Sequence, residues 1–254
     1  MDSRWRSGVL RPRRNKDLHG FNRVPRRLPV EITMNAIQAT DLRKNYAGEK
    51  ALDGISLSVD SGALFGIIGA DGAGKTTLLR ILATLTRQDC GVARVLGLDT
   101  IKDAQFLRAR IGFMPQKFSL YEDLSVRENL AFFADIFGVP SSQKNERIER
   151  LLRFSLLGAF QERRARFLSG GMKQKLALSC ALIHTPDLLL LDEPTTGVDP
   201  VSREEFWAIL RDLRQQGIPI LVSTPYLDEA EYCDRLMLLH QGRELISGAP
   251  TDLL

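Results

Sequence analysis

The sequence predicts an α/β protein with a mostly parallel core sheet, and two observations lead to that prediction. Towards the carboxyl end, apolar runs of strand length at 188–191 and 218–223 alternate with a helical pattern at 202–216. Earlier in the chain, an apolar run at 63–68 leads through a glycine-rich turn into a helical pattern at 77–85. Such alternation is typical of a parallel sheet covered by helices.

The remaining segments predict two additions to this core. Short alternating runs at 37–42 and 55–59, separated by a turn that contains Gly48, predict an antiparallel β subdomain. The interval 104–182 is mostly helical in its period and predicts an inserted helical subdomain. Its helical patterns are 126–137, 145–157 and 171–183. Near the end of the chain, the further patterned segments are 227–234, 236–240 and 244–247.

Composition excludes several classes of protein. The chain has 254 residues, of which 44% are hydrophobic and 26% charged, so it is neither a disordered protein nor a disulfide scaffold. No apolar run approaches the ~18 residues of a membrane-spanning helix, so a membrane role is expected only through a partner chain. Cys90, Cys180 and Cys233 lack metal-ligand spacing, which favours reduced thiols in a cytosolic protein.

The basic charge of the sequence is concentrated in residues 1–33. Eight arginines and one lysine against three acids give this segment +6, whereas the whole chain carries +4. Because residues 34–254 are therefore slightly acidic, a nucleic-acid-binding body is not expected. The segment lacks apolar periodicity and contains three prolines, which predicts a disordered extension. Three roles of this segment stay open: an extension without function, an arm that contacts a membrane or nucleic acid, and a transit peptide. Its acidic residues disfavour the transit peptide.

The stretch G-A-D-G-A-G-K-T that begins at Gly69 matches the phosphate-loop pattern, between an apolar strand and a helix. Gly69, Gly72 and Gly74 allow successive amides to face phosphate oxygens. Lys75 would bring a positive charge to the β- and γ-phosphates, and Thr76 would offer a hydroxyl to Mg²⁺. The glycine spacing does not fit a dinucleotide-binding fingerprint. The candidate nucleotide-binding residues of this loop are Gly69, Ala70, Asp71, Gly72, Ala73, Gly74, Lys75, Thr76 and Thr77.

Two carboxylates follow the apolar run 188–191. Ligands of open α/β sheets bind at the carboxyl ends of the strands, where Asp192 and Glu193 are expected. Asp192 is placed to hold Mg²⁺ through its coordination shell, and Glu193 to reach a water opposite the γ-phosphate.

A second anion site is predicted at the start of the helical pattern 171–183. Ser169 is a suitable N-cap, and Gly170 and Gly171 expose backbone amides at a positive helix end. A chain with two phosphate sites suggests that sites are shared across a dimer.

The ordered motifs GADGAGKTT, FMPQ, LSGGMKQK, LLLLDEP and TTGVDP resemble the nucleotide-binding domain of an ATP-binding cassette (ABC) transporter, over residues 34–254. LSGGMKQK, FMPQKFSLYEDLSVRENL and STPYLDEAE look closest to the ATPases of ABC-2-type exporters, particularly the first half of those with tandem cassettes. The resemblance implies a P-loop NTPase fold of ABC type, with ATP and Mg²⁺ as cofactors.

The resemblance also implies roles for single residues. ATP would lie between two cassettes, with Ser169 and Gly171 of one completing the site of the other. Gln116 would sense Mg²⁺ and the attacking water, Tyr46 would stack on adenine, and Asp199 would lie at the dimer seam. The implied catalytic residues are Glu193, Gln116 and Lys75, and the implied metal ligands are Thr76, Gln116 and Asp192.

The sequence departs from the family pattern at Pro225. Members usually carry a histidine there, after the last core strand, where the imidazole contacts the γ-phosphate. Proline supplies neither a side-chain donor nor a backbone N–H. Two functions therefore stay open: an ATP-hydrolysing exporter subunit with slow turnover, or a degenerate cassette that holds ATP as dimer glue.

The expected partners are an ABC-2-type transmembrane permease and a second cassette, identical or different, on this polypeptide or another. The expected location is cytoplasmic, peripheral on the inner face of the cell membrane. The run 117–127 is either core packing or a groove for a permease helix. A nucleic-acid- or ribosome-associated ABC ATPase is disfavoured by the charge of the body and by the absence of coiled-coil heptads.

Overall fold

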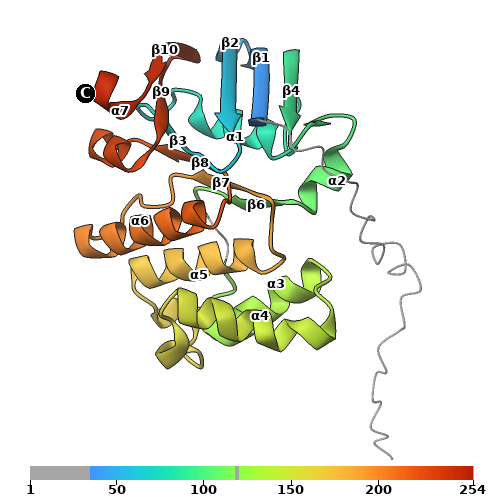
Figure 1. Cartoon of the computed structure of the whole chain (residues 1–254), viewed down its shortest axis with the longest axis vertical. Helices are drawn as coiled ribbons and strands as arrows, with labels where there is room; N and C mark the ends of the chain where they lie inside the picture. Colours follow the sequence, from blue (N-terminus) through green and yellow to red (C-terminus); the bar gives the residue numbers. More distant parts are fainter. Residues whose placement is uncertain (1–34, 118–119, 254) are drawn as a thin grey trace, which may run out of the picture.

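The computed structural model describes residues 35–117 and 120–253. The basic segment 1–33, expected to be a disordered extension, lies outside the described residues. Within them the chain forms a small antiparallel sheet, a larger mostly parallel sheet and helices on both sides of the latter (Figure 1). This arrangement confirms the predicted α/β class.

The small sheet has strands in the order β2-β1-β4-β5. Its strands are β1 (Asn35–Tyr46), β2 (Glu49–Asp60), β4 (Cys90–Val95) and β5 (Leu98–Asp99). The predicted runs 37–42 and 55–59 lie inside β1 and β2, which pair antiparallel as expected. The sequence prediction missed β4, whose residues are mostly exposed, because Gly91 and Arg94 interrupt its apolar pattern.

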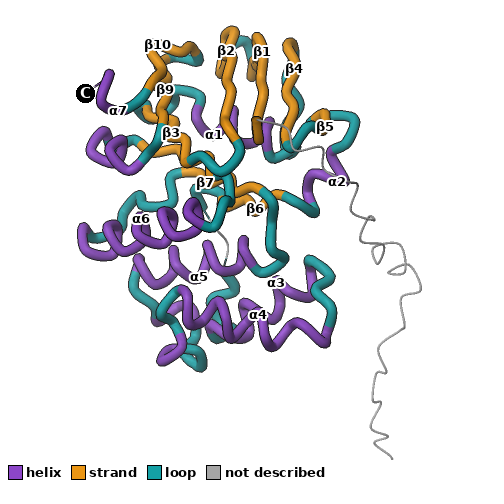
Figure 2. The backbone as a smooth tube through the Cα atoms, in the orientation of Figure 1, coloured by secondary structure: helices purple, strands orange, loops and turns teal. Residues whose placement is uncertain are grey.

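The larger sheet has strands in the order β10-β9-β3-β8-β7-β6. Its strands are β3 (Leu64–Ile68), β6 (Ile111–Met114), β7 (Leu188–Asp192), β8 (Ile220–Thr224), β9 (Arg235–His240) and β10 (Arg243–Gly248). The pairings from β9 to β6 are parallel, and β10 adds an antiparallel edge. The carboxyl ends of β3, β7 and β8 therefore lie side by side, which brings distant segments of the chain together (Figure 2).

Hydrophobic packing explains why the core strands read as continuous apolar runs. In β7, Leu189 and Leu191 belong to the apolar cluster that includes the long helices α5 and α6. Leu188 and Leu190 belong to the cluster on the opposite face, with α1 and the small sheet. A sheet buried on both faces needs apolar residues at every position.

Three of the described helices begin at a residue whose side chain caps them, namely Ser125, Ser169 and Asp199. Ser125 forms a capping box with Glu128, and Asp199 accepts a hydrogen bond from the Ser202 amide. The helices are α1 (Lys75–Leu82), α2 (Ala104–Arg108), α3 (Val126–Ile136), α4 (Ser141–Phe154), α5 (Gly170–Leu182), α6 (Pro200–Gln215) and α7 (Pro250–Leu253), with 3₁₀ turns η2 (Gly158–Phe160), η3 (Ala165–Phe167) and η4 (Leu227–Tyr232).

The interval 104–182, expected to be helical, contains β6 as well as four helices. β6 pairs with β7 and so belongs to the larger sheet. The helices α3, α4 and α5 that follow lie together on the side of this sheet away from the small sheet (Figure 1).

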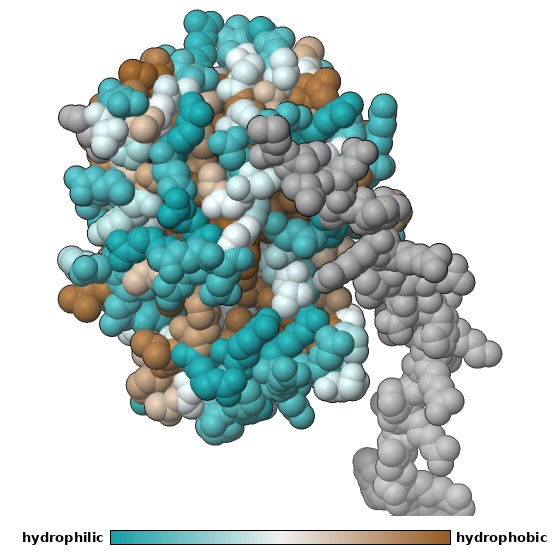
Figure 3. Space-filling model, viewed as in Figure 1, coloured by the Kyte–Doolittle hydropathy of each residue, from teal (hydrophilic) through white to brown (hydrophobic). Residues whose placement is uncertain are grey.

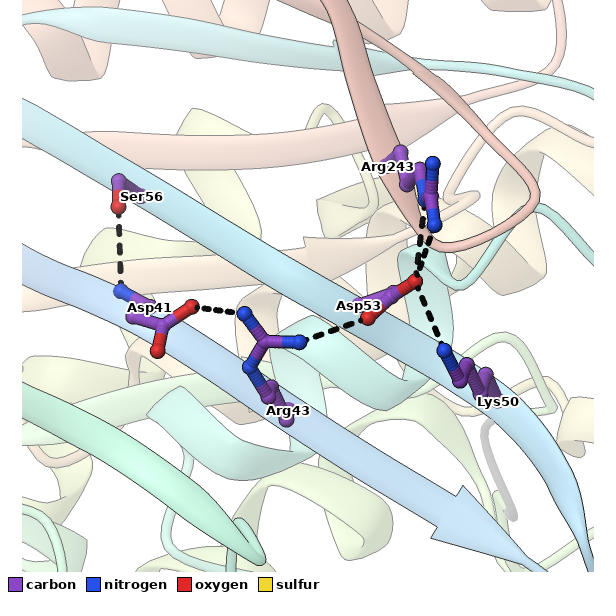
Figure 4. A network of polar contacts seen from close by, with 6 residues as sticks. All are labelled: Asp41, Arg43, Lys50, Asp53, Ser56 and Arg243. Carbon is purple, nitrogen blue, oxygen red and sulfur yellow. Dashed lines mark hydrogen bonds and ion pairs between the residues drawn. The ribbon is translucent and has the colours of Figure 1, made fainter.

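An ionic cluster joins the two sheets (Figure 4). Asp53 on β2 accepts hydrogen bonds from Arg43 on β1 (2.9 Å), from Lys50 (3.3 Å) and from Arg243 on β10 (2.7 and 3.0 Å). Hydrogen bonds, first from Arg243 and then from Lys50, lower the pKa of the Asp53 carboxyl. The Asp53 amide also donates to the carbonyl of Gly242 at 2.8 Å, so backbone and side chain anchor β2 to the β9–β10 turn.

Apolar and hydrophilic side chains are interspersed on the surface in view (Figure 3). Exposed large apolar residues such as Leu156 and Phe167 occur in different elements. Among the described residues, no helix combines the length and hydrophobicity that crossing a membrane requires.

Candidate nucleotide-binding site

The phosphate loop connects β3 to α1 and is packed closely against its neighbours. Gly72 and Gly74 have φ of 77° and 107°, which only glycine adopts without strain. A Cβ at Gly74 would lie 2.5 Å from the Ala51 carbonyl oxygen, and one at Gly69 would lie 2.3 Å from the Leu239 carbonyl oxygen. The loop therefore requires glycine both for its curvature and for its contacts.

Lys75, the first residue of α1, is almost fully buried. Its ammonium Nζ donates hydrogen bonds to the carbonyl oxygens of Gly69 (2.6 Å) and Ala70 (3.0 Å). It also forms an ion pair with Glu193 Oε1 at 3.0 Å, and the two side chains are 3% and 4% exposed. A buried ion pair of this kind places a positive charge inside the loop, where a phosphate would compete for it.

Asp192 lies at the end of β7 and receives two hydroxyl hydrogen bonds. Ser223 Oγ and Thr76 Oγ1 donate to its Oδ1 at 2.8 and 3.2 Å. Burial raises the pKa of Asp192 above its ordinary value, and these hydrogen bonds oppose the rise. A carboxylate and a hydroxyl are hard oxygen ligands, and Mg²⁺ is typically held by one or two such groups together with substrate phosphates. The residues present therefore fit Mg²⁺.

Glu193 is held by three segments that are distant in sequence. Its amide donates to the carbonyl and hydroxyl oxygens of Ser223, at 3.1 and 3.0 Å. Gln116 Nε2, at the end of β6, donates to its Oε2 at 2.9 Å. The backbone φ of Glu193 is 49°, in the left-handed region that costs a non-glycine residue about 1–3 kcal/mol. Such strain is concentrated at functional sites.

The loop and these side chains surround a hollow of about 290 Å³. It is lined by Ala51, Asp71, Gly72, Ala73, Gly74, Lys75, Thr76, Thr77, Gln116 and Glu193. Tyr46, expected to stack on adenine, does not line it. Tyr46 lies at the end of β1, is 45% exposed, and has the Lys44 ammonium 5.4 Å from its ring centroid.

Ser169 and Gly171 lie at the start of α5 and do not line the hollow either. Ser169 is the N-cap and accepts a hydrogen bond from the Met172 amide at 3.3 Å. A Cβ at Gly171 would lie 2.4 Å from the Ser202 Cβ, so this glycine permits close packing of α5 against α6. Within one chain, the second candidate anion site and the phosphate loop thus stay separate.

The sequence prediction missed two groups beside this site. One is Ser223, which contacts both Asp192 and Glu193. The other is Glu229 on η4, which is 1% exposed and accepts hydrogen bonds from Thr195 and Thr224. The signal was their place in the stretch STPYLDEAE. Asp192, Glu193 and Thr195 lie 30 to 34 positions from the group that they contact, whereas Thr224 is five positions from Glu229.

The comparisons with known proteins agree with this geometry. The family model described as ABC transporter matches residues 52–196, from within β2 to the segment after Glu193. The chain belongs to the ABC transporter family. Its phosphate loop, Asp192 and Glu193 therefore lie in an ABC-type ATP-binding cassette.

Two curated relatives are named as ATP-binding proteins of transport systems. The probable multidrug ABC transporter ATP-binding protein YbhF of Escherichia coli is 46% identical over 87% of this chain. The match spans only 38% of YbhF. The Nod factor export ATP-binding protein I of Paraburkholderia xenovorans is 41% identical over 86% of this chain and 72% of the relative.

A solved structure extends the similarity to the fold. The dimeric structure of a post-hydrolysis state of the ATP-binding cassette MJ0796, bound to ADP and Pi, has a TM-score of 0.76. It is 25% identical, and the match covers 84% of this chain and 98% of MJ0796. The fold of the whole cassette is thus one in which ADP and phosphate have been observed.

Proposed function

We propose that this protein hydrolyses ATP and thereby energises export through a separate ABC-2-type membrane permease. The observation that supports this most directly is the convergence of Lys75 and Gln116 on the carboxylate of Glu193. The three groups come from the phosphate loop, β6 and β7, and all line one hollow. A base, a cation and an amide at one point are the components that phosphoryl transfer to water requires.

Glu193 would act as the general base. Its carboxylate would accept a proton from the water that attacks the γ-phosphorus, while the bond to the ADP oxygen breaks. Gln116, hydrogen-bonded to Glu193 Oε2, would orient that water. Lys75 would exchange its ion pair with Glu193 for a phosphate oxygen, which leaves Glu193 available as a base. The strained φ of Glu193 fixes the direction of its side chain.

The proposed metal ligands are Thr76, Asp192 and Gln116. When bound there, Mg²⁺ would neutralise charge on the β- and γ-phosphates. Ser223, which donates to the same Asp192 Oδ1 as Thr76, at 2.8 Å, would hold the ligand carboxylate in place.

A second cassette is proposed to complete the site. Ser169 is exposed to solvent at the N-terminus of α5, where amides and the helix dipole favour an anion. Ser169 and Gly171 do not line the hollow of their own chain. We propose that exposed Ser169, at the helix start that buried Gly171 helps to build, contacts a nucleotide held by a partner chain. Asp199, the N-cap of α6 beside this segment, would lie at the seam. The dimeric form of the similar MJ0796 cassette supports this arrangement.

The proposed partner and location follow from the relatives. One curated relative is named as a Nod factor export protein and the other as a multidrug ABC transporter protein. These names support a permease partner and a peripheral position on the inner face of the cell membrane. A degenerate cassette that holds ATP as dimer glue is the second candidate, and Pro225 is the observation that favours it. No nucleic-acid partner is proposed.

The Glu193→Gln variant tests the proposed reaction. It keeps the shape of the side chain and removes the base, so the rate of phosphate release should fall about 10²–10⁴-fold while ATP binding persists. Light scattering with ATP and Mg²⁺ should show a longer-lived dimer, since hydrolysis normally ends the ATP-bridged state. Glu204→Gln, at an exposed position on α6, is the matched control.

Two results would contradict the proposal. An unsubstituted protein no faster than Glu193→Gln would favour the degenerate cassette. A Glu193→Gln protein that stays monomeric with ATP, even beside a partner cassette, would exclude the shared site.

A further inference from the structure

A carboxylate that lines no part of the nucleotide hollow is buried behind the site. Glu229 on η4 is 1% exposed. Its Oε1 accepts a hydrogen bond from Thr195 Oγ1 at 2.8 Å, and its Oε2 accepts one from Thr224 Oγ1 at 2.5 Å. Burying a carboxylate is costly unless hydrogen bonds compensate it. An apolar residue would fill this space at lower cost, so the two hydrogen bonds are the feature that needs an explanation.

Both threonines belong to segments that position the reacting groups. Thr195 follows Glu193 by two residues and begins the segment 195–199 that leads to α6. Thr224 ends β8, directly after Ser223, which bonds Asp192 and the Glu193 amide. The Thr224 carbonyl also accepts a hydrogen bond from the Gly69 amide at 3.3 Å. Glu229 thus bridges two segments that adjoin the γ-phosphate end of the site.

The loop that carries Pro225 is fixed through the same group of residues. Thr224 Oγ1 accepts a hydrogen bond from the Tyr226 amide at 3.1 Å. The guanidinium of Arg203, on α6, lies 4.3 Å from the Tyr226 ring centroid, and its Nε lies 3.6 Å from Glu229 Oε1. The residues on either side of Pro225 are therefore both tied to Glu229, directly or through Arg203.

From these contacts we propose that Glu229 is a positioning residue for hydrolysis. It joins the segment 195–199, expected at the dimer seam, to the loop 224–226, and so holds both in register with Glu193. Proline at 225 offers no side-chain donor to a phosphate. In this chain the position of the loop therefore depends on the Glu229 carboxylate, which does not line the hollow. This inference rests on the proposed function for its effect on rate, but the joining of the two segments is testable without hydrolysis.

Steady-state kinetics of the full chain test the effect on rate. Glu229→Gln and Thr195→Val should each lower kcat for ATP about tenfold or more, because small misplacements of reacting groups are costly. The KM for ATP should stay within about twofold, since neither residue lines the hollow. Thr195→Ser keeps the hydroxyl and should retain most of the rate. Glu231→Gln, an exposed position on the same η4 turn, is the matched control and should change nothing.

The two substitutions should also be coupled. Glu229→Gln removes the charge and one of the two acceptor oxygens of this carboxylate, and Thr195→Val removes one of its two hydroxyl donors. Both weaken the same connection, so the double variant should lose much less than the product of the two single losses. Independent, multiplicative losses would overturn the direct connection between these side chains. If Glu229→Gln fails to fold, the comparison of Thr195→Val with Thr195→Ser still tests the proposal.

Amide hydrogen exchange on the nucleotide-free chain tests the joining itself. Glu229→Gln should speed exchange at the amides of 196–198 and at Tyr226, whose amide bonds Thr224 Oγ1, and Glu231→Gln should not. Unchanged exchange in both segments would overturn the proposal whether or not ATP is hydrolysed. Faster exchange with unchanged kcat would overturn the positioning role alone. An unsubstituted protein without hydrolysis would instead contradict the proposed function, and the exchange result would still decide whether Glu229 joins the segments.

Discussion

The start of α1 and the start of α5 are both helix N-termini with glycines and both are candidate phosphate sites, yet their surroundings differ. At α1, Lys75 is 3% exposed and has three oxygen partners within 3.0 Å. At α5, Ser169 and Gly170 are exposed, and the one hydrogen bond of the Ser169 side chain is its own N-cap. The first site has its charged and polar groups assembled within one chain, whereas the second presents backbone amides to solvent.

The difference indicates how the two sites depend on other molecules. An assembled loop can hold a nucleotide in a single chain, because its cation and its backbone are already in place. An exposed helix N-terminus contributes only dipole and amides, each worth a fraction of a kcal/mol to about 1 kcal/mol. We therefore expect substitutions at α1 to change the affinity of the single chain for ATP, and substitutions at α5 to leave that affinity nearly unchanged and to affect ATP hydrolysis by two chains together.

The largest expected effect is that of Lys75→Ala. Removing a buried charge-assisted contact costs about 1.5–3 kcal/mol, so the affinity of the single chain for ATP should fall about 10–150-fold. Calorimetric titration with ATP and Mg²⁺ measures it, and Lys102→Ala, at an exposed lysine, is the control. Unchanged affinity would mean that the α1 loop is not the phosphate site and would remove the basis of the comparison.

The next effect in size is that of Pro225→His. If the missing imidazole limits turnover, the substitution should raise kcat about tenfold, which corresponds to ~1.4 kcal/mol of the barrier. A preorganised donor can supply more, but Thr224 and Tyr226 are held in place and limit how a new ring is oriented. Phosphate release at saturating ATP measures it. An unsubstituted rate of ~1 s⁻¹ or faster would show that Glu193 and Gln116 suffice.

The smallest expected effect on nucleotide affinity is that of Ser169→Ala. The single chain should bind ATP within about twofold of the unsubstituted affinity, while loss of the N-cap lowers the free energy of unfolding by about 0.5–2 kcal/mol. Ser142→Ala, at an exposed position on α4, is the control for the loss of a serine.

Mixing variants sharpens the same comparison. A heterodimer of Lys75→Ala and Ser169→Ala chains contains one shared site with both groups intact, so the mixture should hydrolyse ATP faster than either variant alone. A Ser169→Ala chain with an affinity as weak as that of Lys75→Ala would instead place Ser169 at the nucleotide of its own chain.

Local patterns allowed much of the fold to be predicted. β1, β2, β3, β7 and β8 follow from apolar runs, and α6 follows from the helical period predicted over 202–216, although the helix begins two residues earlier, at Pro200. β4 was missed because its exposed side chains leave no apolar run. The predicted strand 218–223 begins two residues before β8, since apolar Ile218 precedes Pro219 and packs against the core without joining the sheet.

The candidate site was predictable where chemistry is local and unpredictable where it depends on contacts between distant segments. The loop pattern identifies Lys75 and Thr76 by spacing alone. The ion pair between Lys75 and Glu193 and the hydrogen bond between Thr195 and Glu229 join segments that lie far apart in sequence, so no short window of sequence contains them. From sequence alone, the glycine at position 171 is explained by the exposure of its backbone amide. The structure adds a second reason, because a Cβ there would lie 2.4 Å from the Ser202 Cβ.

The left-handed backbone of Glu193 has a consequence for the evolution and engineering of this chain. Glycine adopts a φ of 49° without strain, whereas glutamate at this φ is strained. Glycine would relieve this strain, but it would also leave the buried Lys75 ammonium without its carboxylate partner, and removing one member of a buried ion pair costs about 3–5 kcal/mol. The cost of breaking the pair exceeds the strain relieved, so selection for thermal stability of the nucleotide-free chain would itself retain glutamate at this position.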